Sequence, residues 1–333
     1  MKQYGFLLVW TTAFLVATAG CTGGGAGPEK KGRESLTQTG SSTVLPLAIA
    51  WAEEFEGADI SVSGGGSSHG LNALLEGDAQ LGDASRLMKS KDYEKVGCPG
   101  EDVKSDGTAS APCKGVKPEK WLISYDVLVI VVNNENSWAT KLTYEQLQKI
   151  FTDDSPAVYW DEVEGLTGAP HEKIEIYAPD EASGTYDFFF EEIIADWGQD
   201  SQAANTRLDA GDGVYHPSAD DNVILNAIRD NKNAIGYFGF AYYKENTEAV
   251  TPVWVGKDAG SIEEPSLANV AAYPMARPLH IYTDGIPSKG SAVGDYMAYV
   301  LSEEGQSLVP EVGYVKLDLV DEALLKEQRN RLN

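Results

Sequence analysis

Three short turns in the sequence carry side chains that suit the binding of an anion. Residues 40–43 read Gly-Ser-Ser-Thr, residues 66–68 read Gly-Ser-Ser, and residues 183–185 read Ser-Gly-Thr. Serine and threonine hydroxyls donate hydrogen bonds, and glycine lets a ligand approach the backbone closely. None of these side chains is charged, so the chemistry they favour is hydrogen bonding to a compact anion.

Each turn is expected to follow a strand and to precede a helix. The segments "LTQT", "DISVS" and "KIEIYA" are strand-like, and helical spacing follows the turns, as with Leu47, Trp51 and Phe55. The first N–H groups of a helix lack internal partners, and the helix dipole adds partial positive charge there. An anion therefore fits at such a junction. An ordinary N-cap is the alternative for any single turn, but three in one chain favour a shared anion site.

Strands that alternate with helices indicate an α/β fold with mostly parallel sheets. Residues 122–132 contain a near-continuous apolar, β-branched run, which is typical of a strand buried on both faces. Thr143 and Gln146 have the spacing of a capping box, which predicts the start of a helix. The 333 residues, 42% of them apolar, suit one two-lobed domain or two ordinary domains with a sizeable core.

The charge balance is strongly acidic, with 51 acidic and 26 basic residues and a formal net charge of −25. This balance excludes a nucleic acid as partner, because binding to its backbone needs clustered lysine and arginine. The acids are spread along the chain, which is typical of a solvated surface in a salty medium that screens repulsion. We therefore expect anion capture by short-range hydrogen bonds in a dry cleft.

Residues 1–21 have the form of an export signal. An apolar segment from Gly5 to Gly20 follows Lys2 and is short for a membrane span. "TAGC" resembles the end of a lipoprotein signal, with lipid attached at Cys21, although Thr18 stands where leucine is usual; an ordinary cleaved signal is the alternative. Residues 22–35 read as a flexible tether. We expect a protein at the cell surface or in the periplasm, bound to the membrane by its lipid anchor only.

Cys98 and Cys113 flank a loop of turn-forming residues. In an exported protein this arrangement favours a disulfide over a metal site. The sequence has no Cys-x-x-Cys motif and no histidine at zinc spacing. We expect neither a metal nor a cofactor.

Together, these segments resemble the phosphate-binding lipoproteins that deliver substrate to phosphate ABC transporters. "TGSSTVLPLAIAWAEEF", "GGGSSHGLNALLEG" and "LGDASRLMK" are similar to the first three ligand segments of that family, and "SGTYDFFFE" is similar to the fourth. The Ser-Gly-Thr motif is the most specific piece. The segment "SADDNVILNAIRDNKNAIGYFGFAYY" is similar to a further family segment, and the resemblance runs from about Leu36 to Gly313.

The resemblance implies a two-lobed α/β fold of the periplasmic-binding-protein, or Venus-flytrap, kind with a ligand cleft between the lobes. We expect lobe I to comprise residues 36–126 and 252–333 and lobe II to comprise residues 127–251, with crossings near residues 127–133 and 250–255. The resemblance also implies inorganic phosphate as ligand, the membrane permease of an ABC transporter as partner, and a monomer that is not an enzyme. The phosphate-binding residues carried over from the family are Ser42, Thr43, Ser67, Arg86, Ser183, Gly184 and Thr185.

Two positions depart from the best-known branch of the family. Arg86 stands where that branch has an aspartate, and Pro179 stands where it has an arginine. Arg86 is expected to supply the charged donor, with a surface ion pair as the alternative. A site selects phosphate over sulfate through an acceptor for the phosphate proton. We expect another carboxylate in that role, and the candidates are Asp187, which we favour slightly, Asp180 and Asp221.

Three other functions remain open. A binder of another tetrahedral oxyanion, such as sulfate or molybdate, would use the same donors. Gly66-Ser67-Ser68-His69-Gly70 fits the Gly-x-Ser-x-Gly elbow of a serine hydrolase, but few strands precede it, and the four histidines show no partner pattern. An adhesion or structural lipoprotein would keep the fold without the ligand.

Overall fold

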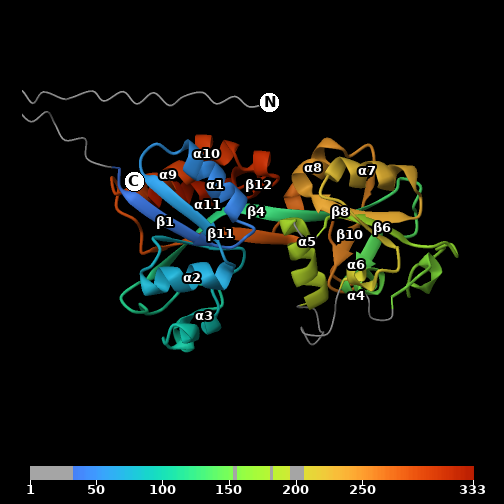
Figure 1. The fold of residues 1–333 in the computed structure, drawn as a ribbon, viewed down its shortest axis with the longest axis horizontal. Coiled ribbons are helices and arrows are strands. Elements are labelled where there is room, and N and C mark those ends of the chain that lie inside the picture. Colours follow the sequence, from blue (N-terminus) through green and yellow to red (C-terminus); the bar gives the residue numbers. More distant parts are fainter. Residues whose placement is uncertain (1–32, 153–155, 181–182, 196–205) are drawn as a thin grey trace, which may run out of the picture. The chain divides into compact units, whose positions relative to one another are not determined.

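Two long strands run side by side through the middle of the fold. The computed structural model describes residues 33–152, 156–180, 183–195 and 206–333. Strands β4 (Pro118–Val132) and β11 (Ala276–Asp284) pair antiparallel, and Figure 1 shows them running from one group of helices to the other. The apolar run expected at residues 122–132 forms most of β4, and every residue of this run except Tyr125 is buried.

Within the described residues the main sheet has the spatial order β2-β1-β3-β11-β4-β8-β6-β7, and β9 and β12 also pair with β4. Strands β10 and β5 form a separate pair. The bounds of the other strands are β1 (Ser35–Gly40), β2 (Asp59–Gly64), β3 (Leu81–Ala84), β5 (Lys141–Thr143), β6 (Glu175–Ala178), β7 (Tyr215–Pro217), β8 (Ala234–Gly239), β9 (Thr251–Pro252), β10 (Trp254–Gly256) and β12 (Val315–Lys316).

The sheet is mixed. Strand β1 runs parallel to β2 and β3, and β6 runs parallel to β7 and β8. Strands β11 and β4 run antiparallel to each other and to their neighbours β3 and β8. The expectation of mostly parallel sheets is therefore correct for the two outer groups of strands and wrong for the centre. The reason is topological: a chain that passes out to a second group of strands and back again runs in opposite directions on the two passes.

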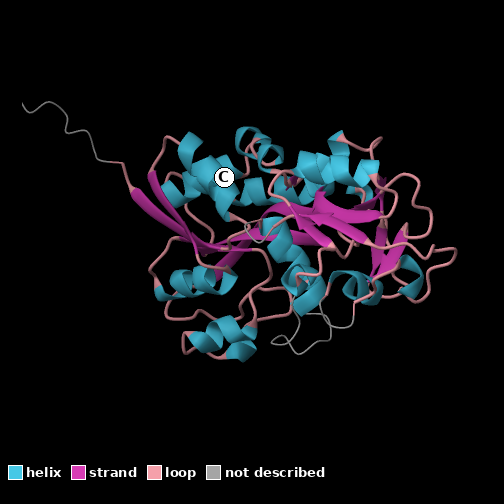
Figure 2. Ribbon diagram, turned by 45° about the vertical axis from the view of Figure 1, so that its right-hand side comes forward, coloured by secondary structure: helices cyan, strands magenta, loops and turns pink. Residues whose placement is uncertain are grey.

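Helices lie on both sides of the strands (Figure 2). The α-helices are α1 (Leu45–Glu54), α2 (Ser67–Glu76), α3 (Ser90–Lys95), α4 (Tyr144–Phe151), α5 (Gly184–Phe189), α6 (Arg207–Ala210), α7 (Asp221–Asp230), α8 (Phe240–Glu245), α9 (Ala292–Val300), α10 (Glu303–Ser307) and α11 (Asp318–Arg331). A π-helical turn, η3 (Phe190–Ala195), continues α5. Short 3-10 turns occupy Gly100–Asp102, Trp160–Glu162, Leu267–Asn269 and Pro310–Val312.

Capping side chains explain where several helices begin. Thr143 Oγ1 accepts from the Gln146 N–H at 3.3 Å, and Gln146 Oε1 accepts from the Thr143 N–H at 2.9 Å, so the expected capping box of α4 is confirmed. Helices α9 and α10 are separated by only a short turn. Ser302 Oγ accepts from the Gly305 N–H at 3.0 Å and starts α10 as a new helix.

Two hydrophobic cores share the long strands. Trp51, Ile123 and Leu279 belong to the first core, whereas Val127 and Met275 belong to the second. Strand β4 therefore passes from the first core to the second between Ile123 and Val127. The chain returns to the first core between Met275 and Leu279, at the start of β11.

The position at which the chain returns to the first core indicates where lobe II ends. Val253, Val255 and Val270 pack in the second core, although lobe II was expected to end at residue 251. We propose that lobe II extends to about residue 275, so that both crossings lie in the paired strands β4 and β11. Two lobes that are connected by two adjacent strands can rotate about one hinge axis, which suits a flytrap motion.

A third buried cluster packs beneath α2 and α3 and includes Tyr93 and Cys113. Cys113 is bonded to Cys98, with the two Cα atoms 5.8 Å apart, as the sequence predicted. The expected signal, Cys21 and nearly all of the tether lie outside the described residues. No helix in the described part of the chain is long and apolar enough to span a bilayer.

Asp83 is a buried carboxyl group in β3. Its Oδ1 accepts from Gln38 Nε2 at 2.9 Å, and Gln38 Oε1 accepts from the Tyr296 hydroxyl at 2.8 Å. Its Oδ2 is buried without a partner among the described residues. Burial raises the pKa of Asp83 to about 8, against the smaller opposing effect of the Gln38 hydrogen bond. The folded protein therefore keeps this carboxyl protonated in moderately acidic and neutral solution.

Replacing both Cys98 and Cys113 with alanine is expected to lower the free energy of unfolding by about 3 kcal/mol. The disulfide closes a loop with a sequence separation of 15 residues, which restricts the unfolded chain. Urea unfolding of wild type and variant measures the difference, and reduced wild-type protein should show the same loss. Equal stability of the oxidised wild type and the variant would contradict the expectation.

Asp83→Asn is expected to remove a pH dependence of stability. The unfolded chain releases the Asp83 proton near its ordinary pKa of 3.8, whereas the folded chain holds it until about pH 8. In that window the contribution of Asp83 to the free energy of unfolding falls by about 1.4 kcal/mol for each pH unit. The stability of the variant relative to wild type should therefore rise from pH 4 to pH 8 and level off above it. Urea unfolding across this range tests the expectation, and parallel pH profiles would refute it.

Candidate anion-binding site

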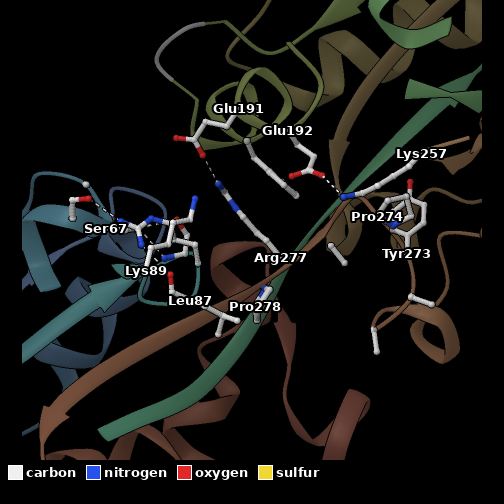
Figure 3. A pocket seen from close by; sticks show the side chains of 18 of the residues that line it. Ser67, Leu87, Lys89, Glu191, Glu192, Lys257, Tyr273, Pro274, Arg277 and Pro278 are labelled. Carbon is white, nitrogen blue, oxygen red and sulfur yellow. Dashed lines mark hydrogen bonds and ion pairs between the residues drawn. The ribbon is translucent and has the colours of Figure 1, made fainter. Parts of the chain in front are cut away.

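A cavity of about 1040 Å³ opens beside β11 (Figure 3). Its lining consists of residues 65–68, several residues between 257 and 278, and Ser85, Arg86, Leu87, Lys89, Phe188, Glu191 and Glu192. In Figure 3 Ser67 and Lys89 lie at one end, Lys257 and Tyr273 lie at the other, and Arg277 extends between them. The volume is that of a small-molecule site.

The turn before α2 brings hydroxyl and N–H donors to one end of the cavity. Gly66 is the N-cap of α2 and has φ 87°, a conformation that side chains disfavour. Ser67 Oγ accepts from the Ser85 N–H at 3.1 Å and lies 3.3 Å from Ser85 Oγ. Both serines line the cavity, where the positive end of the α2 dipole also lies.

Arg86 lines the same end of the cavity. Its Nη1 and Nη2 donate to the two carboxylate oxygens of Asp92 at 2.8 and 2.9 Å, and Nη2 also donates to Ser68 Oγ at 2.8 Å. Burial favours a raised pKa for Asp92, but the hydrogen bonds and charge of Arg86 and the Lys89 N–H outweigh it and hold that pKa below its ordinary value. The side chain of Asp92 is only 2% exposed and that of Arg86 is 27% exposed. Arg86 thus has a buried counterion and still reaches the cavity.

The turn at residues 40–43 lies next to the lining without forming part of it. Ser42 is exposed, whereas Thr43 is buried. Thr43 Oγ1 accepts from Arg277 Nη2 at 2.8 Å, and the Thr43 carbonyl accepts from the Tyr314 hydroxyl at 2.6 Å. Arg277 therefore connects Thr43 to the cavity.

The Ser-Gly-Thr turn begins the helix that lines the cavity further on. Ser183 Oγ accepts from the Thr185 N–H at 3.2 Å, and α5 begins at Gly184. Ser183 and Thr185 are not among the described lining residues, but Phe188, Glu191 and Glu192 are. The structure therefore brings Ser67 and Arg86 together in the cavity and leaves Ser42, Thr43, Ser183 and Thr185 outside its described lining.

The spacing of core residues explains why those glutamates, Glu191 and Glu192, stay out of the core. The buried side chains on either side of them recur five positions apart, as Phe188 with Ile193 and Phe189 with Ile194. Residues five apart share a face in a π-helical turn, which the chain adopts at Phe190–Ala195. An α-helix would place Phe188 and Ile193 on faces roughly 140° apart, because it advances about 100° per residue.

Two of the carboxylates expected as proton acceptors lie elsewhere. Asp180 precedes the Ser-Gly-Thr turn, where its carbonyl accepts from the Ser183 N–H at 3.0 Å. Asp221 starts α7, and burial, together with the charge of Asp220, raises its pKa. Neither is in the cavity lining, and the side chain of Asp187 lies outside the described part of the structure. The carboxylates that do line the cavity include Glu191 and Glu192.

Arg277 is a cationic residue of the cavity that the sequence reasoning missed. Its Nε donates to Asp126 Oδ2 at 3.0 Å, its Nη2 bonds Thr43, and its Nη1 donates to Glu191 Oε2 at 3.2 Å. Its guanidinium carbon lies 4.1 Å from the centre of the Phe188 ring. Burial raises the pKa of Asp126, and the charge of Arg277 opposes that rise.

A sequence signal for this pair does exist. Asp126 interrupts the apolar run of β4, and Arg277 stands in the apolar segment "PMARPLHIY". Charged residues inside buried strands are rare unless paired. The signal singles out two charged residues but not their partnership, which depends on the register that places Arg277 opposite Asp126.

The far end of the cavity is polar but not cationic overall. Glu192 Oε1 accepts from the Tyr144 hydroxyl at 2.8 Å and lies 3.6 Å from Lys257 Nζ. The Tyr273 hydroxyl is buried without a partner among the described residues. No group of histidine, cysteine and acidic side chains in the described residues has the arrangement of a metal site. The geometry suits a compact anion held by hydroxyl, N–H and guanidinium donors.

Comparisons with known proteins agree with this chemistry. The family model described as "PBP superfamily domain" matches residues 25–304. The phosphate-binding protein PstS of Staphylococcus saprophyticus is 32% identical over 320 residues, which cover 94% of this chain and 89% of that protein. The protein of the same name from Staphylococcus epidermidis is 31% identical over 319 residues, with coverages of 92% and 88%.

Solved structures agree as well. The crystal structure of a possible phosphate binding protein from Planctomyces limnophilus matches with a TM-score of 0.75 and 29% identity, covering 91% of this chain and 98% of that one. An ABC-type phosphate transport receptor from Vibrio cholerae, at 21% identity and a TM-score of 0.58, shares the fold over 84% of this chain and 99% of its own. The chain has the two-lobed periplasmic-binding-protein fold, and it belongs to the PBP superfamily and, within it, to the family of the PstS phosphate-binding proteins.

Proposed function

We propose that this protein binds inorganic phosphate outside the cytoplasmic membrane and delivers it to the permease of an ABC transporter. The observation that carries the proposal is the cavity end where the Ser67 and Ser85 hydroxyls, the start of α2 and the Arg86 guanidinium converge, in a chain of the PstS family. Each of these groups donates hydrogen bonds to an anion, and two of them add positive charge.

The proposed ligands are the seven residues expected from the sequence, together with Ser85. Ser67 and Arg86 already line the cavity. The Ser-Gly-Thr turn belongs to the helix that carries Phe188 into the same cavity. Closure of the lobes about β4 and β11 would bring that turn to the anion, as in hinge closure around a ligand. The family resemblance and the shared helix support this assignment.

A serine hydrolase is disfavoured by the bonding of the elbow serine. In Gly66-Ser67-Ser68-His69-Gly70 the nucleophile would be Ser68, whose hydroxyl donates to Asp92 Oδ1 at 3.0 Å and accepts from Arg86. A nucleophilic serine needs a general base oriented for proton transfer. A carboxylate paired to arginine has its basicity lowered, as the depressed pKa of Asp92 shows. The relatives are transport receptors and not enzymes.

The export and attachment of the protein are part of the same proposal. "TAGC" after an apolar segment supports lipid attachment at Cys21, and the Gly-rich residues that follow support a tether that lets a monomeric domain reach the permease. Mass spectrometry of the N-terminal peptide from membrane-extracted protein tests the anchor. An unmodified peptide beginning at another residue would exclude it.

Calorimetric titration of the mature protein is expected to show phosphate binding at least about a hundredfold tighter than sulfate binding at neutral pH. Phosphate carries a proton that a cavity carboxylate accepts, whereas sulfate meets that carboxylate with unpaired negative charge, a difference of a few kcal/mol. Equal affinities would favour a general oxyanion binder. Absence of binding to either anion would favour a structural lipoprotein.

Thr185→Ala is expected to weaken phosphate binding about 10- to 100-fold, because loss of one hydrogen bond to a charged ligand costs about 1.5–3 kcal/mol. Thr185→Ser keeps the hydroxyl and should keep most of the affinity. Thr247→Ala, at an exposed position outside the cavity lining, serves as a control. The same titration measures all three, and wild-type affinity in Thr185→Ala would remove Thr185 from the site.

A further inference from the structure

The carboxylates bound to the cavity guanidinium groups differ sharply in exposure. Asp92, bound to Arg86, is 2% exposed, and Asp126, bound to Arg277, is 4% exposed. Glu191, which binds the remaining terminal nitrogen of Arg277, is 63% exposed. Asp92 and Asp126 are therefore permanent buried counterions, whereas Glu191 reaches Arg277 from the solvent side of the cavity.

We propose that Arg277 is an anion-binding residue of this site and that Glu191 is a tethered carboxylate that the incoming anion displaces. The inference rests on the proposed function and adds a binding residue and an internal competitor to it. A carboxylate oxygen and a phosphate oxygen are equivalent acceptors for a guanidinium N–H. The Oε2 atom of Glu191 occupies the position that a phosphate oxygen takes in the complex of the protein with phosphate.

Arg277 keeps its orientation when Glu191 leaves. Asp126 holds Nε at 3.0 Å and Thr43 holds Nη2 at 2.8 Å, so two bonds fix the plane of the guanidinium. The Phe188 ring covers one face, with its centre 4.1 Å from the guanidinium carbon. The vacated Nη1 therefore points into the cavity as a preorganised donor, and its orientation has little entropic cost.

Charge balance favours displacement over coexistence. Asp126 already neutralises Arg277, and Glu191 adds a second negative charge beside it. A phosphate dianion next to both carboxylates would be repelled at short range. Because Glu191 is largely exposed, water replaces its bond to Arg277 at small cost, in line with the low value of exposed ion pairs. Asp126 is buried, so water cannot replace its bond to Arg277 in the same way.

The contact also joins parts of the site that the sequence separates. Thr43 follows β1 in the first turn, Glu191 follows the Ser-Gly-Thr helix, and Arg277 stands on β11 between the two cores. Exchange of Glu191 for an anion oxygen breaks the bond between Glu191 and Arg277 without loosening the bond between Arg277 and Thr43. The anion then contacts Arg277 on β11, and Arg277 is in turn bonded to Asp126 on β4 and to Thr43 in the first turn.

Titration of phosphate into the mature Glu191→Gln variant tests the competitor. We expect binding about two- to fivefold tighter than in wild type, because an exposed ion pair that opposes binding is weakened. Glu248→Gln removes the same charge at an exposed position outside the cavity lining and should leave the affinity unchanged. Unchanged or weaker phosphate binding in Glu191→Gln would overturn the proposal. Selective weakening for phosphate but not for sulfate would show that Glu191 stays and accepts the phosphate proton.

The double variant Arg277→Gln with Asp126→Asn tests the cation. Removing both charges avoids a buried unpaired carboxylate, so the fold is expected to persist, and a thermal melt checks it. Phosphate affinity should fall at least about tenfold, and affinity equal to wild type would overturn the role of Arg277. Wild-type protein without phosphate affinity would overturn the proposed function and this inference together. If the wild-type protein binds phosphate and both variants bind it with the wild-type affinity, this inference alone is overturned.

Discussion

The antiparallel pairing of β4 with β11 is the constraint on which the rest of the structure depends. Both hydrophobic cores are attached to these two strands, and the pairing continues across the boundary from Ala276 opposite Val127 to Asp284 opposite Pro118. Where both strands are buried, their backbone groups must satisfy each other, so the register is fixed. That register places Arg277 opposite Asp126 at the boundary between the cores, where a buried charge pair can reach the cavity.

The site shows how an acidic protein can hold an anion. The net charge of −25 works against long-range attraction. At short range the cavity offers serine hydroxyls, the N-terminus of α2 and guanidinium groups whose charge is balanced by buried aspartates. Such balanced groups keep their directional N–H donors, and the buried partners fix their geometry. Recognition therefore depends on the placement of donors more than on net charge.

Local sequence patterns predicted the features that local interactions determine. The capping box at Thr143, the helix after residues 66–68 and the strand at residues 122–132 follow from short-range rules and are present. The disulfide between Cys98 and Cys113 depended on a single short loop and is also present. The turns with an anion-binding pattern led to Ser67 in the cavity, because strand-to-helix junctions of neighbouring strands gather at one edge of a sheet. Arg86, which also lines the cavity, was expected from the family resemblance and not from these turns.

The missed features depend on contacts between distant segments. Arg277 acquires its role from the register of β11 on β4, and residues 253–275 join the second core through long-range packing that no short pattern encodes. The antiparallel centre of the sheet likewise follows from the path of the whole chain. The role of Glu191 and Glu192 was missed because an α-helical repeat does not place Phe188 and Ile193 on one face, whereas the chain forms a π-helical turn there.

That wide turn makes the length of the segment as consequential as its composition. Deleting one residue between Phe189 and Ile193 would return the flanking buried side chains to a four-residue repeat, which an ordinary α-helix satisfies equally well. The core would then accept the shorter chain, and the loss would fall on the residues between them, which include Glu191 and Glu192 of the cavity lining. A one-residue deletion at this point therefore changes how many carboxylates reach the cavity while leaving the packing of the lobe in phase. The extra residue separates the evolution of ligand chemistry from the evolution of stability.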